Sequence, residues 1–316
     1  MTGYIARRLL QAAGVLWAAF TVSFLILFLL PSDPVSIMLD AASGNGYVDP
    51  AKAAELRASY GFDQGPLEQY LRMLGRALTG DLGTSISSGA KVTTLIAQSF
   101  PETLKLAALA LALSLVLGAG IATASVWTRS GRLRQLLLSL PPVGVAVPTF
   151  WIGLILLQLF SFRFFLFPAV GNEGFASLVL PAVTLAIPLS AVVAQVLAES
   201  MQTAWRTQYV ETALAKGASR GRVITRHVGR NAAIPALTIL GVLVGNLLAG
   251  SVVVETVFSR AGFGRLIQTS VQAQDIPVVQ GLVVVAALVF VLVNLAVDLA
   301  YPVLDPRITR TARTTT

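Results

Sequence analysis

Six long apolar stretches limit what this chain can fold into. A helix needs about 20 mostly apolar residues to cross a hydrocarbon layer about 30 Å thick, because each residue adds about 1.5 Å. Hydrophobic residues make up 55% of the chain and charged residues 12%, against about 25% charged residues in globular proteins. The sequence therefore predicts an all-α polytopic membrane protein with six transmembrane helices: Leu9–Leu30, Leu104–Trp127, Leu136–Phe162, Leu178–Ala198, Ala232–Val254 and Val279–Tyr301.

The basic residues indicate how these spans are oriented. Of the 23 Lys and Arg residues, 14 lie in the N-terminus, in the connections after the second and fourth spans, and in the C-terminal tail. Because cytoplasmic loops are enriched in Lys and Arg, both termini and the fourth–fifth loop are predicted to be cytoplasmic. Arg7 and Arg8 could also open a cleavable signal, but the apolar run after them is about 22 residues long and no A-x-A site follows. We therefore interpret this run as a retained anchor.

This orientation divides the chain into parts. A helix-like stretch at 49–60 and turn chemistry at 80–83 lie outside the spans, and neither has catalytic spacing. The predicted parts are the cytoplasmic N-terminus with the first span (1–30), an extracytoplasmic segment (31–101), a five-helix core (102–304) that includes a cytoplasmic loop (199–231), and a cytoplasmic tail (305–316).

Missing residue types exclude several kinds of chemistry. The chain has no Cys and a single His, His227, which excludes thiol catalysis, zinc–thiolate sites and a His-rich metal site. It has no G-x-x-x-x-G-K-[ST] motif, so it cannot bind ATP through a P-loop. We interpret the net charge of +8 as a topology signal rather than a nucleic-acid surface. The sequence therefore predicts no catalytic, metal-binding or cofactor-binding residue in this chain, and no nucleic-acid partner.

Few polar residues interrupt the spans, although prolines are dense in the third and fourth spans and predict kinks. The ionisable residues Lys105, Glu199, Glu255 and Asp298 lie within a turn or two of a span end, so we expect anchors in the headgroup region. Three neutral polar residues inside spans fit either interhelical hydrogen bonds or the lining of a pathway. These candidate pathway residues are Gln195, Asn246 and Asn294.

The connection between the fourth and fifth spans is amphipathic. The segment Tyr209–Lys216 is helix-prone, Gly217 breaks the pattern, and Ser219 is suited to cap a second helix. We therefore expect two short helices that meet at Gly217. A basic helix on the membrane surface is the alternative, but the Glu, Ala and Gly residues fit a protein groove better.

The sequence of this loop resembles the EAA motif of binding-protein-dependent ABC importer permeases. In Glu211-Thr-Ala-Leu-Ala-Lys-Gly217 the glycine follows the glutamate by six residues, and Thr212 replaces the middle alanine of the motif. Other segments resemble the B-type subunit of the dipeptide, oligopeptide and nickel subgroup, so that the likeness covers nearly the whole chain. These segments include Tyr4–Leu10, Gly80–Ser85, His227–Pro235, Glu255–Gly264 and Asp298–Arg307.

The resemblance implies a type I ABC importer permease fold in the bacterial cytoplasmic (inner) membrane, with a cytoplasmic coupling helix between the fourth and fifth spans. The implied partners are a homologous C-type permease in a heterodimer, one or two P-loop ATPase subunits that bind ATP and Mg, an extracytoplasmic solute-binding protein, and membrane lipid. The chain itself is then neither an enzyme nor a cofactor carrier. The residues implied to contact the ATPase are Tyr209, Glu211, Thr212, Ala213, Ala215, Lys216, Gly217 and Arg222.

The function implied by the resemblance is ATP-driven import of di- or oligopeptides by alternating access. The same subgroup also serves nickel and other small solutes, so the substrate stays open at this point. An ATP-independent secondary transporter is a further alternative. It would need coupling carboxylates or broken helices near the midplane in each of two repeats, whereas the acidic residues here are peripheral and no repeat is evident.

Overall fold

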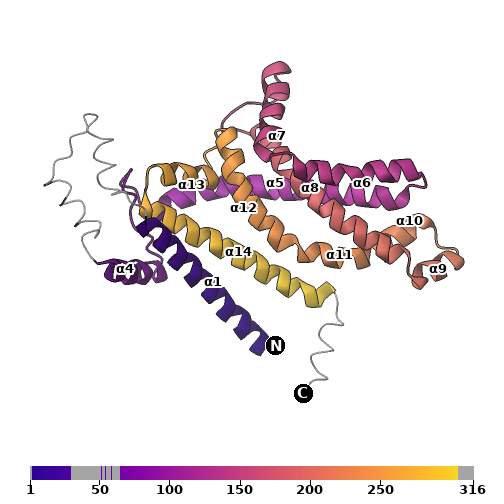
Figure 1. Ribbon diagram of the computed structural model, residues 1–316, viewed down its shortest axis with the longest axis horizontal. Helices are drawn as coiled ribbons and strands as arrows, with labels where there is room; N and C mark the ends of the chain where they lie inside the picture. The colour runs from indigo at the N-terminus through magenta and orange to yellow at the C-terminus, as the bar shows by residue number, and fades with distance from the viewer. Residues whose placement is uncertain (1, 30–50, 52–53, 55–57, 59–64, 305–316) are drawn as a thin grey trace. The chain divides into compact units, whose positions relative to one another are not determined.

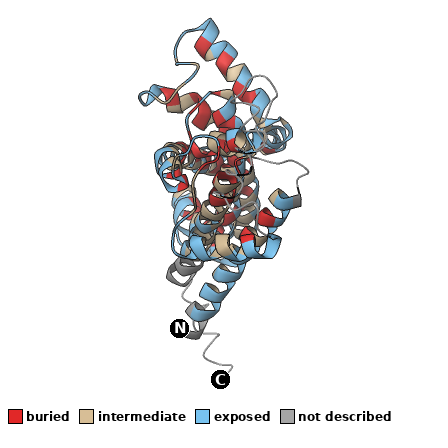
Figure 2. Ribbon diagram, turned by 90° about the vertical axis from the view of Figure 1, so that its left-hand side faces the viewer, coloured by how far each residue is buried: buried red, intermediate tan, exposed pale blue. Residues whose placement is uncertain are grey.

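The structure is a computed structural model that describes residues 2–29, 51, 54, 58 and 65–304 (Figure 1). In these residues the regular structure is helical, apart from an isolated bridge between Thr84 and Lys91. Most of the predicted helix at 49–60 lies outside the described residues. Figure 2 shows exposed residues along much of the helical surface. Many of them are large and apolar, as expected for a surface that faces lipid.

Four helices are long and apolar enough to cross a membrane. They are α1 (Thr2–Leu29), α5 (Val92–Trp127), α8 (Ala176–Trp205) and α14 (Ile276–Leu304) (Figure 1), and their apolar segments contain 22 to 36 residues. At about 1.5 Å per residue, even the shortest extends about 33 Å and so exceeds the hydrocarbon thickness. These helices confirm four of the six predicted spans.

The third predicted span, Leu136–Phe162, is bent rather than straight. The first part, α6 (Gly131–Ala146), ends just before Pro148. The second part consists of α7 (Thr149–Leu156) and the π-helical η1 (Leu157–Arg163), and it leaves at 100° to the first. Proline lacks an amide hydrogen and its ring clashes with the preceding turn, which explains why the helix breaks here. The bend confirms the kink that the prolines predict in the third span, and the two parts count as one span only if the bent pair is taken together.

The fifth predicted span, Ala232–Val254, is interrupted. It is divided at Ile239 between α11 (Gly229–Thr238), which contains Pro235, and α12 (Leu240–Val257). The apolar helix Gly241–Val257 extends only about 26 Å at the rise of an α-helix. The described helices therefore provide four spans, or five if the bent pair counts as one, rather than six continuous ones.

Contacts divide the chain into two compact units. The first comprises Met1–Thr103 and Ala261–Val291, and the second comprises Leu104–Arg260 and Leu292–Thr316. The first unit contains α1, α4 (Pro66–Leu78) and α13 (Phe263–Gln272). Its buried apolar cluster consists of Val92, Ile96, Phe263, Val278 and Leu282.

Asp275 holds a loop of the first unit in place. Its carboxylate is buried and accepts hydrogen bonds from the Ser87 hydroxyl at 2.7 Å, the Ser85 hydroxyl at 2.5 Å and the backbone N–H of Ile86 at 3.1 Å. These donors replace the water that a buried carboxylate loses. The loop and the start of α14 are therefore joined by a satisfied polar contact.

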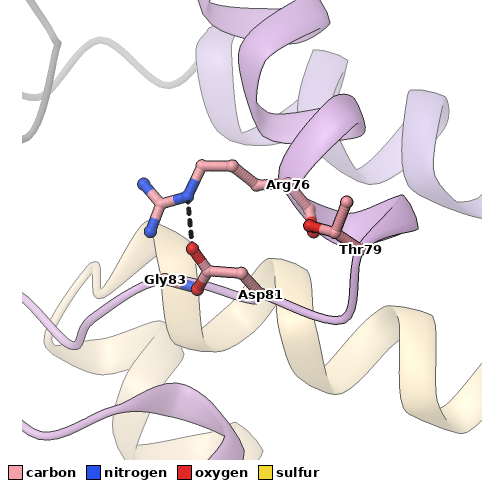
Figure 3. Close-up of polar contacts among 4 residues, drawn as sticks. All are labelled: Arg76, Thr79, Asp81 and Gly83. Carbon is pink, nitrogen blue, oxygen red and sulfur yellow. Dashed lines mark hydrogen bonds and ion pairs between the residues drawn. The ribbon is translucent and has the colours of Figure 1, made fainter.

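The turn at 80–83 has the chemistry that the sequence predicts. Gly80 and Gly83 adopt positive φ angles of 82° and 87°. The Asp81 carboxylate accepts from the Arg76 Nε at 2.8 Å (Figure 3) and from the Gly83 N–H at 3.0 Å. Both hydrogen bonds favour the charged carboxylate, and the one from Arg76 has the larger effect. They hold the pKa of Asp81 below its ordinary value.

The core of the second unit is built around α8. This helix contributes Leu180, Leu185, Leu189 and Val193 to a buried cluster that also receives residues from α5 and α12. It continues through both of its prolines as a single helix. A membrane helix that is buried in this way has most of its surface covered by neighbouring helices rather than by lipid.

Glu255 corrects one prediction from the sequence. Its side chain is only 1% exposed, so it is not an anchor in the headgroup region. Arg260, in the following turn, is equally buried and donates to the carbonyl oxygens of Gly171 and Ser177, both at 3.0 Å. The segment at 171–177 therefore covers the end of α12. The other predicted anchors are Lys105 and Glu199, whose side chains are exposed, and Asp298, whose side chain lies outside the described part.

Candidate functional site

The connection after α8 folds into two short helices that meet at a glycine, as the sequence predicts. The first, α9 (Gln208–Ala215), ends in a pair of hydrogen bonds from the N–H of Gly217 to the Leu214 carbonyl at 2.9 Å and from the N–H of Ala218 to the Ala213 carbonyl at 3.1 Å. This pair defines a Schellman motif. Gly217 has a φ of 82°, in the left-handed region that glycine adopts without strain. No atom lies within 4 Å of the position that a Cβ would take, so the constraint on Gly217 is conformational rather than steric.

The second helix begins as predicted at Ser219. The Ser219 hydroxyl accepts a hydrogen bond from the backbone N–H of Arg222 at 3.4 Å and caps α10 (Arg220–Arg222). The chain continues into the π-helical η2 (Val223–Val228) and then into α11. We refer to residues 208–228 as the two-helix loop.

An apolar base supports the two-helix loop from inside. Val210, Val223, Ile224 and Val228 are buried in one cluster with residues of α5 and α8. Ala213 and Ala218 pack against the same cluster, so the side chain of Ala213 is turned inward and only partly exposed. The side chains that form the base are thus distinct from those that form the outer face of the loop.

Two polar contacts join the two-helix loop to neighbouring helices. The Arg220 guanidinium donates to the Val126 carbonyl at 2.9 Å, near the end of α5, and lies 4.9 Å from the centre of the Trp205 ring at the end of α8. The Asn231 side-chain amide donates to the Tyr209 hydroxyl at 3.0 Å. A displacement of this loop must therefore move the ends of α5 and α8, or break these contacts.

The outer face of the two-helix loop is basic with an apolar apex. Leu214 is 40% exposed at the last turn of α9, directly before the Schellman turn. Residues 208–228 contain four Lys or Arg residues, of which Lys216, Arg222 and Arg226 are exposed, and one acid, Glu211. The predicted contact residues that are exposed are Tyr209, Glu211, Thr212, Ala215, Lys216, Gly217 and Arg222. This arrangement suits a groove that offers apolar surface at its floor and acidic groups at its rim.

Sequence reasoning missed the residues that hold the loop in place. Arg220 is one of several basic residues in the loop, and the sequence does not distinguish it from those exposed to solvent. Leu214 is, in the sequence, one more apolar residue of the helix-prone segment Tyr209–Lys216. The sequence does hold one signal for where the loop packs. Trp127 and Trp205 each end a long apolar segment, and both rings lie against the loop. A Cβ at Gly221 would lie 2.8 Å from the ring of Trp127, so this glycine permits the close packing of loop and helix.

The three candidate pathway residues are not gathered in one cavity. Gln195 lines an open pocket of about 470 Å³ between α6 and α8, together with Glu199 and Gln202. Asn246 is exposed on α12 and does not line this pocket. Asn294 packs against Gly241, where an added Cβ would overlap its side-chain oxygen. Asn294 thus packs closely against α12 at this glycine.

The helices and the loop together define a class: a multi-pass helical membrane protein with a folded, basic element between two spans. Residues 114–310 match the family described as binding-protein-dependent transport system inner membrane component. The chain is 33% identical over 313 residues to a Sinorhizobium fredii protein named "Probable peptide ABC transporter permease protein", covering 96% of this chain and 98% of that one. It is 35% identical over 308 residues to the glutathione transport system permease protein GsiC of Pectobacterium atrosepticum, covering 98% and 99%.

A solved structure agrees at the level of the fold. The inward-facing methionine ABC transporter MetNI has a TM-score of 0.58 to this chain, over 67% of this chain and 97% of that chain. At 15% identity this likeness shows the fold alone. The chain belongs to the family of binding-protein-dependent transport system inner membrane components.

Membership in this family confirms the predicted class of function. The chain is the multi-pass permease of an inner-membrane ABC transport system and a non-catalytic component of it. In such a system a separate ATPase uses ATP, and a binding protein delivers the solute. No group of residues suited to hold a metal ion occurs among the described side chains.

Proposed function

We propose that this chain is one permease subunit of an ATP-driven importer for di- or oligopeptides in the cytoplasmic membrane of a bacterium. The substrate class rests on the relatives. Those with 33–35% identity over nearly their whole length are named as permeases for peptides or for glutathione, which is a tripeptide. Import of nickel or another small solute by the same machinery is the second candidate, and an ATP-independent carrier is a weaker third.

We further propose that the two-helix loop docks in a groove of the ATPase subunit. The observation that supports this role is the contact between Arg220 and Val126, because it connects an exposed, folded element to the end of a membrane helix. When the ATPases close on ATP and Mg, they would displace the loop, and the helices would switch between inward-open and outward-open states. Leu214, Ala215 and Gly217 would form the apex, with Tyr209, Glu211, Thr212, Lys216 and Arg222 around it.

The proposed arrangement in the membrane keeps six crossings. In it, the bent pair of α6 with α7 and η1 forms the third crossing, and α11 with α12 forms the fifth. Both termini and the two-helix loop are then cytoplasmic, and residues 31–101 are extracytoplasmic. This topology places the basic loop on the side where the ATPase lies and the residues before α5 on the side where a solute-binding protein docks.

The proposed complex contains a second, C-type permease subunit. One permease of this type lines half of a pathway, so a heterodimer with a homologous chain completes it. One or two P-loop ATPase subunits supply the ATP and Mg sites that this chain lacks, and lipid covers its outer surface. In this scheme Gln195, Asn246 and Asn294 stay candidates for the pathway, and the pocket beside Gln195 is the feature that favours that residue.

Affinity purification from the native membrane tests the proposal. Mass spectrometry of the proteins that co-purify with the tagged chain should identify a second permease and one or two P-loop ATPases. Uptake of a labelled tripeptide should then depend on the genes for those ATPases. Uptake that survives their deletion would identify a secondary carrier, and uptake of nickel but of no peptide would favour the second candidate.

A further inference from the structure

The helix α4 carries an apolar stripe that is largely exposed in the described part of the chain. Leu67, Leu71, Leu74 and Leu78 are spaced four, three and four residues apart, so they lie on one face of the helix. Leu67 is 71% exposed, Leu71 57% and Leu78 81%. Leu74 is partly buried, but three exposed leucines on one face of a 13-residue helix are unusual for a segment surrounded by water. We refer to these four residues as the leucine stripe.

The rest of α4 has the division expected of an amphipathic helix. Gln69 is buried and Tyr70 is partly buried on the side that packs against the first unit. Glu68, Arg72 and Arg76 lie on a polar side, and the two arginines border a pocket of about 280 Å³ that also contains Asp81. An apolar face next to a polar face rich in basic residues is typical of helices that lie in the plane of a membrane interface.

Contacts with α1 place α4 at a defined distance from the end of the apolar segment of that helix. The Tyr70 hydroxyl hydrogen-bonds with the Thr21 hydroxyl at 2.8 Å, and its ring lies edge-on to Phe20 and Phe24 at 5.8 and 5.3 Å. Thr21 lies seven residues before the end of the apolar segment Ala6–Phe28, which is about 10 Å along the helix. In Figure 1, α4 lies beside the C-terminal end of α1. Apolar faces of interfacial helices sink about 5–10 Å below the headgroups, which matches this depth.

The adjacent surface of α1 is itself apolar and exposed. Val22, Leu25 and Ile26 are each at least half exposed and lie in the last two turns of the spanning segment. Leu25 is one helical turn from Thr21, and Leu71 follows Tyr70 on α4. Exposed apolar side chains on α1 and on α4 thus both lie next to the contact between Thr21 and Tyr70.

We propose that α4 is an interfacial helix whose leucine stripe is inserted among the acyl chains of the bilayer. Arg72 and Arg76 would then lie at headgroup level, where long basic side chains are favoured. The inference rests on the contacts of α4 with α1, and it does not depend on the substrate or on the ATPase. It means that a part of the segment between the first two spans is membrane-bound.

Site-directed labelling of the full-length chain tests this placement. The natural chain contains no cysteine, so Leu71→Cys and Leu78→Cys each create a unique attachment site for a bimane fluorophore. Glu68→Cys, on the polar side of the same helix, is the matched control. The purified chain, with the subunits that co-purify, is placed in nanodiscs of phosphatidylcholine that carries bromine on the acyl chains. Bromine quenches bimane only within the hydrocarbon, and iodide quenches it only in water.

The expected result is at least twofold stronger quenching by brominated lipid at positions 71 and 78 than at position 68, with the reverse order for iodide. Equal iodide quenching at all three positions would overturn the proposal, because the stripe would then lie in water. Protection of positions 71 and 78 from both quenchers would also overturn it, because protein would then cover the stripe. Protection that arises only when a peptide-loaded binding protein is added would assign the stripe to docking of that protein instead.

Discussion

The Arg220 guanidinium donates to the main-chain carbonyl of Val126 at 2.9 Å and thereby ties the two-helix loop to the end of α5. Helix ends leave carbonyl groups without intrahelical partners, and a cation is favoured near them. The Trp205 ring adds a cation–π contact with the same guanidinium at 4.9 Å. A single side chain of the loop thus contacts the ends of two long helices.

Arg220→Gln should weaken coupling more than docking. The variant loses a charged hydrogen bond, which contributes about 1–3 kcal/mol, while the outer face of the loop is unchanged. We expect the ATPase to co-purify as with the natural chain, and substrate uptake per ATP hydrolysed to fall. Arg226→Gln, at an exposed position in the same loop, is the control and should leave uptake unchanged. Equal effects of the two variants would contradict the assigned role of Arg220.

Gly217→Val should disrupt the apex of the loop. A β-branched residue in the left-handed region is strained by about 1–2 kcal/mol or more, and the Schellman turn would open. We expect ATPase association to be lost while the chain still inserts into the membrane. Gly217→Asn is the matched variant, since Asn tolerates this conformation better, and it should retain most of the association. Transport at the natural rate in Gly217→Val would refute the docking role of the turn.

Leu214→Asp should weaken docking without unfolding the loop, because Leu214 is already 40% exposed. Burying a leucine contributes about 1.5–3 kcal/mol, so we expect at least about a tenfold loss of affinity for the ATPase. Affinity can be measured by titrating purified ATPase onto the chain in nanodiscs. Thr225→Asp introduces the same charge at another exposed position of the loop and should change the affinity less. If both substitutions weaken binding equally, the effect is one of charge and not of the apex.

Gly241→Ala should destabilise the second unit by about 1–3 kcal/mol through overpacking, because the added methyl group overlaps the Asn294 side chain. Asn294→Ala in the same chain should remove the overlap and restore much of the loss. Thermal unfolding of the four proteins, natural, single and double, measures this coupling. Additive losses in the double variant would show that the two residues do not meet.

The stability of the turn at 80–83 should depend on pH in one direction. Arg76 and Gly83 lower the pKa of Asp81 in the folded chain, so the unfolded chain binds a proton on Asp81 at a higher pH than the folded chain does. The stabilisation is therefore fully present above the ordinary Asp pKa of 3.8 and is lost as the pH falls below it. The effect should be small, because both side chains are about half exposed.

Asp81→Asn measures that contribution. The stability difference between the natural chain and this variant should be constant from pH 7 to about pH 5 and should shrink below pH 4. Local hydrogen exchange at Leu82 and Gly83 is the readout, because it reports opening of the turn itself. A difference that grows as the pH falls would contradict the assignment.

The length of the apolar runs was enough to predict most of the spanning helices, but not where a span bends. α1, α5, α8 and α14 were predictable because a run of about 20 apolar residues has few alternatives to a spanning helix. The prolines predicted kinks in the third and fourth spans but not which span would break, since a proline-rich span can continue, as α8 does, or break, as α6 and α7 do. Which of these occurs depends on the packing of neighbouring helices.

The site shows the same limit at the level of single residues. Local rules predicted the turn at Gly217 and the cap at Ser219, because both are decided by a few neighbouring residues. The role of Arg220 depends on Val126, 94 residues earlier in the chain. The burial of Glu255 likewise accompanies coverage of the end of α12 by the distant segment 171–177. Contacts of this kind carry no local signature in the sequence.

The separation between the base and the outer face of the two-helix loop has a consequence for evolution and for engineering. Val210, Val223 and Ile224 fix the shape of the loop from inside, and the Schellman turn fixes its apex through the main chain. Neither depends on the exposed side chains that would meet the ATPase. Apart from Tyr209, which also bonds Asn231, those side chains should therefore be exchangeable without refolding the loop, so that the outer face can change while the shape of the loop is kept.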